Sequence, residues 1–221
     1  MTKIKGDEET PDTILLTEYF TYTAPTTATT SGQVATYRTV GGNYDITYNY
    51  TYDKNGNIHT VSDGTNTTTY SYDSANQLIR EDNQEKGKSY TWTYDNAGNI
   101  LSFDTHDYTT GQLGAATSSV PYTYSSPIWG DLLMAYNGTA IQYDGSGNPV
   151  VHGSTRYTWE HGRQLATMTR DGSTWWNYTY NNAGLRTGRY VENGTSYKYV
   201  YNGSQLVQMT TRQGTVLCLD V

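Results

Sequence analysis

Four aspartates are the residues of this chain most able to do chemistry, because each places a carboxylate at the same point of a recurring pattern. They follow an aromatic run and precede a turn rich in Gly and Asn: Asp53, Asp73, Asp95 and Asp144. A catalytic carboxylate needs a partner at a defined distance and belongs to a single site. Recurrence at one repeat position predicts instead that each aspartate caps a turn, accepting backbone N–H groups two or three residues later.

Calcium binding is the alternative for these carboxylates, since Asp-x-x-Gly-Asn turns offer oxygen ligands. A calcium ion takes about six to eight oxygens, and too few carboxylates converge here, so turn capping is preferred. The residues predicted to have this structural turn role are Asp53, Gly56, Asn57, Asp73, Asp95, Gly98, Asn99, Asp144, Gly147, Asn148 and Gly184.

Metal and nucleophile patterns are weak. The histidines are scattered among loops and turns, at His59, His106, His152 and His161. The nearest approach to a ligand set is His106 with Asp104 and Asp107, where a solvated loop is the favoured interpretation. One cysteine, Cys218, gives no internal disulfide and no cysteine zinc cage. Nucleotide-binding and Gly-x-Ser-x-Gly fingerprints are missing, so we predict no catalytic site, metal or cofactor, and no enzyme.

Tryptophans offer a second chemistry, because exposed aromatic rings on a β face stack against sugar rings. The candidates for a carbohydrate groove are Trp92, Trp159, Trp175 and Trp176. A stacked aromatic wall of the sheet explains their regular spacing without a ligand, and this is the preferred interpretation.

The elements that must position these residues repeat along the chain. Seven copies of an aromatic run and a turn align on positions 53, 73, 95, 144, 160, 181 and 202, with a period near 21 residues. The long third step holds an insertion, at about residues 104–136, with a partial aromatic copy at 122–124.

Each copy predicts a β-hairpin. Alternating aromatics, as at Tyr48, Tyr50 and Tyr52, share one face of a strand, and rings of neighbouring copies are expected to stack into ladders. A turn glycine supplies the positive φ of a type I turn followed by a bulge, whereas Gly64 is expected in a looser link. A short turn near 131–134 is the one helical expectation.

Composition supports a folded β protein. The chain has 23 Tyr and 5 Trp but only 2 Phe, so tyrosine replaces aliphatic residues and is expected to bury large rings. The net charge of −7 disfavours nucleic acid as a partner. No apolar run approaches the length of a membrane span, and the first residues lack the apolar core of a signal peptide.

Three regions are predicted: an N-terminal extension with a Thr-rich linker (1–43), the repeat array (44–212) and the start of a further strand (213–221). Repeat arrays normally end in polar caps. Neither end shows one, so the chain is interpreted as part of a longer array.

The motif Tyr-Asp-x-x-Gly-Asn-Ile/Leu, at a period near 21 over residues 44–211, resembles the YD repeat of bacterial Rhs and wall-associated polymorphic toxins, related to teneurins and toxin-complex shell proteins. The resemblance implies an all-β fold of tandem hairpins in an extended, curved antiparallel sheet, part of a spiralling β-shell. The departures from the motif, which leave the turn geometry of those copies open, are Asn76, Glu160, Arg163, Asn181, Asn202 and Gln205.

In function, the resemblance implies a non-enzymatic shell fragment. Its partners would be the remainder of the array and an enclosed C-terminal toxin domain, and the full-length parent would be secreted or displayed at the cell surface. The alternative is a carbohydrate-binding cell-surface or cell-wall module that uses the Tyr/Trp face.

Overall fold

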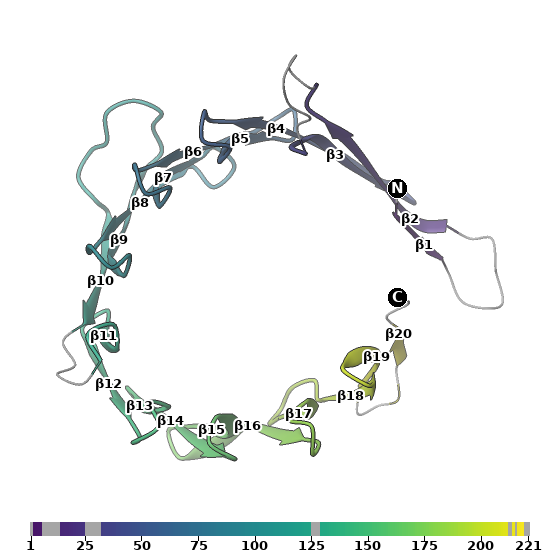
Figure 1. The fold of residues 1–221 in the computed structure, drawn as a ribbon, viewed down its shortest axis with the longest axis vertical. Coiled ribbons are helices and arrows are strands. Elements are labelled where there is room, and N and C mark those ends of the chain that lie inside the picture. The colour runs from purple at the N-terminus through teal and green to yellow at the C-terminus, as the bar shows by residue number, and fades with distance from the viewer. Residues whose placement is uncertain are drawn as a thin grey trace. The chain divides into compact units, whose positions relative to one another are not determined.

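A computed structural model describes residues 2–5, 14–24, 32–124, 129–211, 214 and 216–218. All regular structure in these residues is β-strand, which confirms the predicted all-β class. The chain divides into two units, Met1–Pro121 and Tyr122–Val221. Each unit is an up-and-down meander in which every strand pairs antiparallel with the next (Figure 1).

The strands of the first unit, in chain order, are β1 (Thr2–Lys5), β2 (Ile14–Tyr22), β3 (Val34–Gly41), β4 (Tyr44–Tyr52), β5 (Ile58–Ser62), β6 (Thr67–Tyr72), β7 (Leu78–Asn83), β8 (Lys88–Tyr94) and β9 (Ile100–Asp107). Strand β10 (Ser118–Tyr124) pairs with β9 through residues 118–121. The loop 108–117 joins β9 to β10.

The strands of the second unit continue from residues 122–124 of β10: β11 (Leu133–Tyr136), β12 (Thr139–Tyr143), β13 (Pro149–His152), β14 (Thr155–Glu160), β15 (Gln164–Arg170), β16 (Ser173–Tyr180), β17 (Arg186–Val191), β18 (Tyr197–Asn202), β19 (Gln205–Thr211) and β20 (Val216–Cys218). The backbone of Cys218 lies in β20, and its side chain is outside the described residues.

A register shift recurs in each repeat hairpin, directly before the turn. In the β4–β5 hairpin Thr51 pairs with Thr60 but Tyr52 pairs with Ile58, which leaves His59 as an extra residue on the returning strand. The same shift precedes the aromatic residues Tyr72, Tyr94, Tyr143, Trp159, Tyr180 and Tyr201. A bulge of this kind bends the strand and re-aims the side chains beside it.

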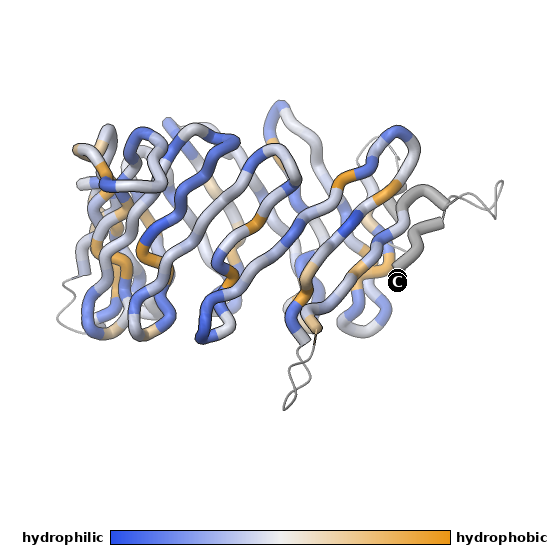
Figure 2. Tube along the Cα trace, turned by 90° about the horizontal axis from the view of Figure 1, so that it is seen from above, coloured by the Kyte–Doolittle hydropathy of each residue, from blue (hydrophilic) through white to orange (hydrophobic). Residues whose placement is uncertain are grey.

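The large aromatic rings are less buried than the sequence predicted. Ala166 is the one hydrophobic residue below a tenth exposed among those with described side chains, and most aromatic residues are half-buried. Within each unit the strands form one layer, so each ring is covered mainly by neighbouring strands (Figure 1). The turns at the strand ends are the most hydrophilic segments (Figure 2).

Two local expectations are corrected by the structure. The segment near 131–134 is no helical turn, because the N–H of Leu132 donates to the carbonyl of Trp129 at 3.0 Å and closes a single tight turn, after which β11 begins at Leu133. The link that contains Gly64 was expected to be looser than the repeat turns. The backbone of Gly64 instead has a φ of +89°, the same as that of Gly56.

The predicted region boundaries stay predictions. On the N-terminal side of residue 44, β3 already pairs with β4 through six residue pairs from Thr36↔Asn49 to Gly41↔Tyr44. Of the predicted last region, 213–221, only 214 and 216–218 are described. No helix in the described part of the chain is long and apolar enough to cross a membrane.

Candidate functional site

The recurring turn is built around one carboxylate. Asp53 Oδ1 accepts the N–H groups of Asn55 (2.8 Å) and Asn57 (2.9 Å), and Oδ2 accepts the side-chain amide of Asn57 (3.0 Å). The N–H of Gly56 donates to the carbonyl of Asp53 at 3.2 Å, and Gly56 has φ +89°. Such a φ favours glycine, so side-chain capping and backbone conformation act together in this turn.

Three other turns repeat this arrangement. Each carboxylate accepts two backbone N–H groups and the side-chain amide of the residue four positions later, in the pairs Asp73–Gln77, Asp95–Asn99 and Asp144–Asn148. In the copy at Asn181 the oxygen accepts only the N–H groups of Ala183 and Leu185. This copy has Asn181 in place of the aspartate and Leu185 in place of the amide residue, so both partners of the third hydrogen bond are changed.

The departures from the motif fall into two kinds. Asn76 occupies the glycine position with φ +62° and keeps the same turn, because Asn tolerates the left-handed region. The copies at Glu160 and Asn202 make shorter turns. The last strand pair before the turn is Glu160 with Gln164 in the first and Asn202 with Gln205 in the second.

Hydrogen-bond donors lower the pKa values of two of the turn carboxylates, Asp95 and Asp144. The side-chain amide of Asn99, then its backbone N–H, hold the pKa of Asp95 below its usual range, and Asn148 does the same for Asp144. A general acid needs the opposite, a raised pKa, so the geometry suits capping.

A lowered pKa predicts acid sensitivity. The folded-state pKa of Asp95 lies below the unfolded value of about 3.9. Its contribution to stability is therefore present above that value and is lost as pH falls through the folded pKa. We expect the melting temperature to fall less steeply below about pH 4 in Asp95→Asn than in the parent chain. Asp131→Asn, at an exposed residue, should leave the acid limb of the pH profile unchanged, and an equal effect of both variants would contradict the assignment.

A second recurring contact joins consecutive hairpins. The aromatic residue before each turn donates its side-chain O–H or N–H to a backbone carbonyl at the start of the preceding returning strand. The pairs are Tyr52 to Val34 (2.9 Å), Tyr72 to Ile58 (2.9 Å), Tyr94 to Leu78 (2.7 Å), Tyr143 to Leu133 (2.6 Å), Trp159 to Pro149 (2.7 Å), Tyr180 to Leu165 (3.1 Å) and Tyr201 to Arg186 (2.9 Å). We call this contact the aromatic rung.

The aromatic rung extends the connection between hairpins where their backbone pairing is short. Between β5 and β6 only three residue pairs are in register, and between β17 and β18 only two. Every rung residue is Tyr or Trp, which have a donor, and none is Phe, which lacks one. The excess of Tyr over Phe in the sequence indicates that such hydroxyl donors are available, but it does not identify the carbonyl that each one meets.

Removing one rung donor has a defined expected cost. Tyr94→Phe keeps the ring and leaves the Leu78 carbonyl without its donor, so unfolding free energy should drop by about 0.5–1.5 kcal/mol. Tyr108→Phe is the matched control, since Tyr108 lies in the loop 108–117 with an exposed ring. Chemical denaturation measures both, and equal values for the two variants would contradict the rung.

The candidate tryptophans are in three different settings. Trp92 packs against Tyr90 and Phe103, with ring centroids 6.4 and 5.3 Å apart. Trp159 supplies an aromatic rung. Trp175 and Trp176 lie together, with centroids 5.3 Å apart. Of the four candidate tryptophans, the structure therefore brings only Trp175 and Trp176 together. In the described residues, the aromatic rings contact one another in small local groups and not in long ladders.

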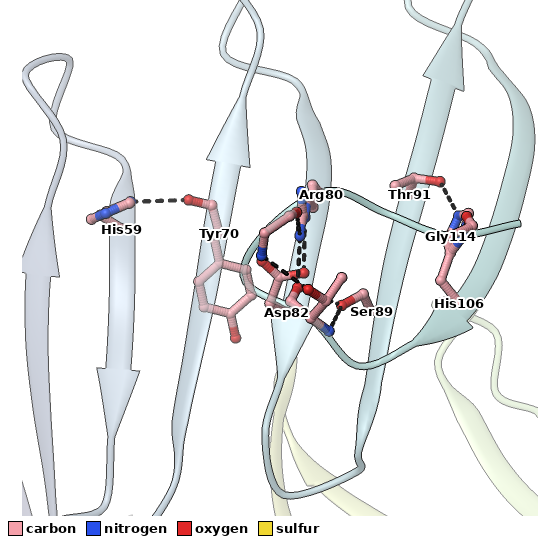
Figure 3. Close-up of polar contacts among 10 residues, drawn as sticks. His59, Tyr70, Arg80, Asp82, Ser89, Thr91, His106 and Gly114 are labelled. Atoms are coloured by element: carbon pink, nitrogen blue, oxygen red, sulfur yellow. Dashed lines mark hydrogen bonds and ion pairs between the residues drawn. The ribbon is translucent and has the colours of Figure 1, made fainter. Parts of the chain in front are cut away.

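The loop 108–117 is held by a buried polar cluster (Figure 3). Arg80 Nε donates to Asp82 Oδ1 (2.8 Å), and Arg80 Nη2 donates to the carbonyls of Thr109 (2.6 Å) and Gly111 (2.9 Å). Ser89 is fully buried; its hydroxyl donates to the Thr109 carbonyl and accepts the Thr109 N–H, both at 3.1 Å. The sequence did not predict this cluster, because its contacts with the loop join residues 20 to 31 apart and end mostly on backbone carbonyls.

Asp82, Ser89 and His106 occupy adjacent positions on β7, β8 and β9, which invites comparison with a Ser-His-Asp triad. A triad requires the serine hydroxyl to bond the histidine and the histidine to bond the acid. Here His106 donates from Nδ1 to the Gly114 carbonyl (3.0 Å), and its Nε2 lies 3.2 Å from Thr91 Oγ1. Ser89 and His106 bond the loop directly, Asp82 acts on it through Arg80, and the three residues do not form a nucleophile–base pair.

The remaining histidines stay apart from one another. His59 Nδ1 lies 3.1 Å from the carbonyl of Tyr70 (Figure 3), His152 packs edge-on to Tyr136, and His161 lies in the tight turn after β14. Among the described residues, no three His, Cys, Asp or Glu side chains form a group able to hold a metal ion.

Together, the turn and the aromatic rung define a class of protein: a β-hairpin repeat array in which each hairpin is closed by a capped turn and tied to the previous one. A family profile described as RHS Repeat matches residues 52–83, from the end of β4 to the end of β7.

The curated relatives that match part of the chain are named as nucleases. The chain is 32% identical over 137 residues to the tRNA3(Ser)-specific nuclease WapA of Bacillus spizizenii, and 29% identical over 137 residues to the tRNA nuclease WapA of Bacillus subtilis. Each match covers 61% of this chain and 5% of the relative.

The solved structures that it resembles share its fold. The Photorhabdus luminescens Tc holotoxin pore matches with a TM-score of 0.61 at 14% identity, over 89% of this chain and 12% of that chain. A TcdB2–TccC3–Cdc42 crystal structure matches with a TM-score of 0.53 at 14% identity, over 90% and 13%. The chain thus contains a segment that matches the RHS Repeat family, shares the fold of these shell structures, and spans a small part of the length of the proteins it matches.

Proposed function

We propose that this chain is a structural segment of an Rhs-type β-shell, and that the shell of the full-length parent encloses a C-terminal toxin domain until delivery. The observation that carries the proposal is the aromatic rung. It ties each hairpin to the one before it, so the array can grow by adding hairpins to a continuous wall.

Two comparisons support the proposal. The fold matches chains of a Tc holotoxin and of a TcdB2–TccC3 complex, and the sequence matches two WapA nucleases, of which it covers only a twentieth. The partners of the segment are then the neighbouring repeats and the enclosed domain, and the parent acts at the cell surface or after secretion.

A deletion in the parent tests this proposal. Removing the segment equivalent to 44–211 should open the wall, so that expression of the parent becomes toxic to the producing cell when its C-terminal domain is active. The matched control carries the same deletion together with an inactivated C-terminal domain and should be tolerated. Equal growth of cells expressing the intact and the deleted active parent would overturn the shell role.

We further propose that the segment has no catalytic activity of its own. The two WapA relatives are named as tRNA nucleases, but the part matched here is a twentieth of their length, and the carboxylates of the repeat turns are occupied as acceptors. The purified chain is therefore expected to leave tRNA intact, with and without Mg²⁺. Cleavage that persists in a highly purified preparation and is lost in Asp82→Asn would contradict this expectation.

Carbohydrate binding is the second candidate function. The structure narrows the candidate residues, because Trp92 and Trp159 already have packing or hydrogen-bonding roles within the sheet. The observation that favours this candidate is the adjacency of Trp175 and Trp176 beside a pocket.

A further inference from the structure

A β-bulge brings Trp175 and Trp176 to one place. Trp176 pairs with Met168, but the next pair joins Thr174 to Thr169, so Trp175 is an extra residue on β16. In a regular strand two successive side chains point to opposite faces. The bulge removes that alternation, and the two indole rings lie 5.3 Å apart at 47°.

The two rings border a pocket of about 270 Å³, which we call the tryptophan pocket, lined by Trp175, Trp176, Val191, Glu192 and Asn193. This volume is just below the ~300–1,000 Å³ typical of sites for drug-sized ligands. It suits one ring of a longer, exposed ligand.

The polar side of the tryptophan pocket is held by the backbone. The N–H of Glu192 donates to the Trp175 carbonyl at 3.0 Å, and the N–H of Val191 donates to the hydroxyl of Ser196, which is 6% exposed. Asn193 has φ +55°, so the turn takes a defined conformation. The backbone that carries Glu192 and Asn193 is therefore held in place before a ligand binds, so ordering it costs little on binding.

The hydrogen-bonding groups of the tryptophan pocket are free to meet a ligand. Within the described residues, the Glu192 carboxylate and the Asn193 amide make no hydrogen bond, and both residues are exposed. An ionised carboxylate only accepts, whereas an amide both donates and accepts. A ligand with two neighbouring hydroxyl groups could donate a hydrogen bond to each carboxylate oxygen of Glu192. Its hydroxyl oxygens could also accept from the side-chain amide of Asn193.

Charge restricts the ligand further. The guanidinium of Arg170 lies 4.7 Å from the centre of the Trp175 ring and fixes that indole by a cation–π contact. The pocket itself contains Glu192, and the chain carries a net charge of −7. An anionic sugar would be repelled.

We propose that the tryptophan pocket binds an uncharged oligosaccharide, one of whose pyranose rings lays its C–H face on the indoles while two vicinal hydroxyls bond Glu192. Sugars with equatorial hydroxyls fit best, because their ring faces carry only C–H bonds. This inference rests on the second candidate function, carbohydrate binding, and is independent of the shell role, so either can fail without the other.

Calorimetric titration of the 221-residue chain with cellohexaose and chitohexaose tests the proposal. At least one of these neutral, β-linked probes should bind saturably. Trp176→Ala should weaken binding about tenfold, the loss of one aromatic contact. Glu192→Ala, an exposed change that spares the fold, should weaken it about threefold or more. Trp92→Phe is the matched control outside the pocket and should bind as the parent chain does.

Three results would overturn the proposal. One is no saturable heat with either neutral probe at millimolar concentration. Another is binding that Glu192→Ala and Trp176→Ala both leave intact. The third is tighter binding of a sulfated hexasaccharide than of the neutral probes, which would place recognition at a cationic surface instead.

Discussion

Replacing Arg80 by alanine is expected to lower the free energy of unfolding of the first unit by about 3 kcal/mol. The guanidinium neutralises Asp82, whose residue is 5% exposed, and donates to two carbonyls of the loop 108–117. Without it a buried carboxylate loses its cation, and the loop loses two of the hydrogen bonds that hold it. Chemical denaturation measures the change, and proteolysis in the loop should accelerate in parallel.

The matched control is Arg38→Ala. Arg38 also forms an ion pair, with Asp45 at 2.6 Å, but both side chains are about half exposed. Exposed pairs contribute little, so this variant should melt close to the parent chain. If the two arginine variants were equally stable, the buried cluster would have no special role in holding the loop.

Replacing Gly56 by valine is expected to cost about 1–2 kcal/mol. Its φ of +89° lies in the region that a β-branched side chain tolerates poorly, and the turn carboxylate holds the backbone in that conformation through Asn55 and Asn57. The unfolding free energy from urea titration is the measurement.

The chain supplies its own control for this variant. Asn76 holds the equivalent position of the next turn with φ +62°, so Gly56→Asn should be much milder than Gly56→Val. A valine variant as stable as the asparagine variant would show that the turn can adopt another conformation at no cost.

Much of the fold could be predicted from the sequence because its signals are local. Alternating aromatics such as Tyr48, Tyr50 and Tyr52 predict a strand, and an aspartate followed three residues later by glycine predicts the turn. Strand and turn lie within ten residues of each other, so the hairpin needs no information from elsewhere in the chain.

The contacts between hairpins could not be predicted in the same way. An aromatic rung ends on a backbone carbonyl, as Tyr94 does on Leu78, and a carbonyl leaves no trace in the sequence. The anchor of the loop 108–117 is similar, since Arg80 reaches the carbonyls of Thr109 and Gly111.

The candidate tryptophans also combine a feature that the sequence predicts with one that it does not. Alternation places aromatics on a face but does not reveal a bulge, so the four tryptophans looked equivalent in the sequence. The register shift between Met168 and Thr169 separates Trp175 and Trp176 from the others.

Protease protection in the full-length parent tests the shell role most directly. With the array intact, a C-terminal domain should survive a protease concentration that digests the same domain expressed alone. A variant of the parent that combines Arg80→Ala with Gly56→Val in this segment should lose that protection at a lower temperature than the parent does. Digestion of the C-terminal domain at the same rate in the intact parent and in isolation would contradict the account.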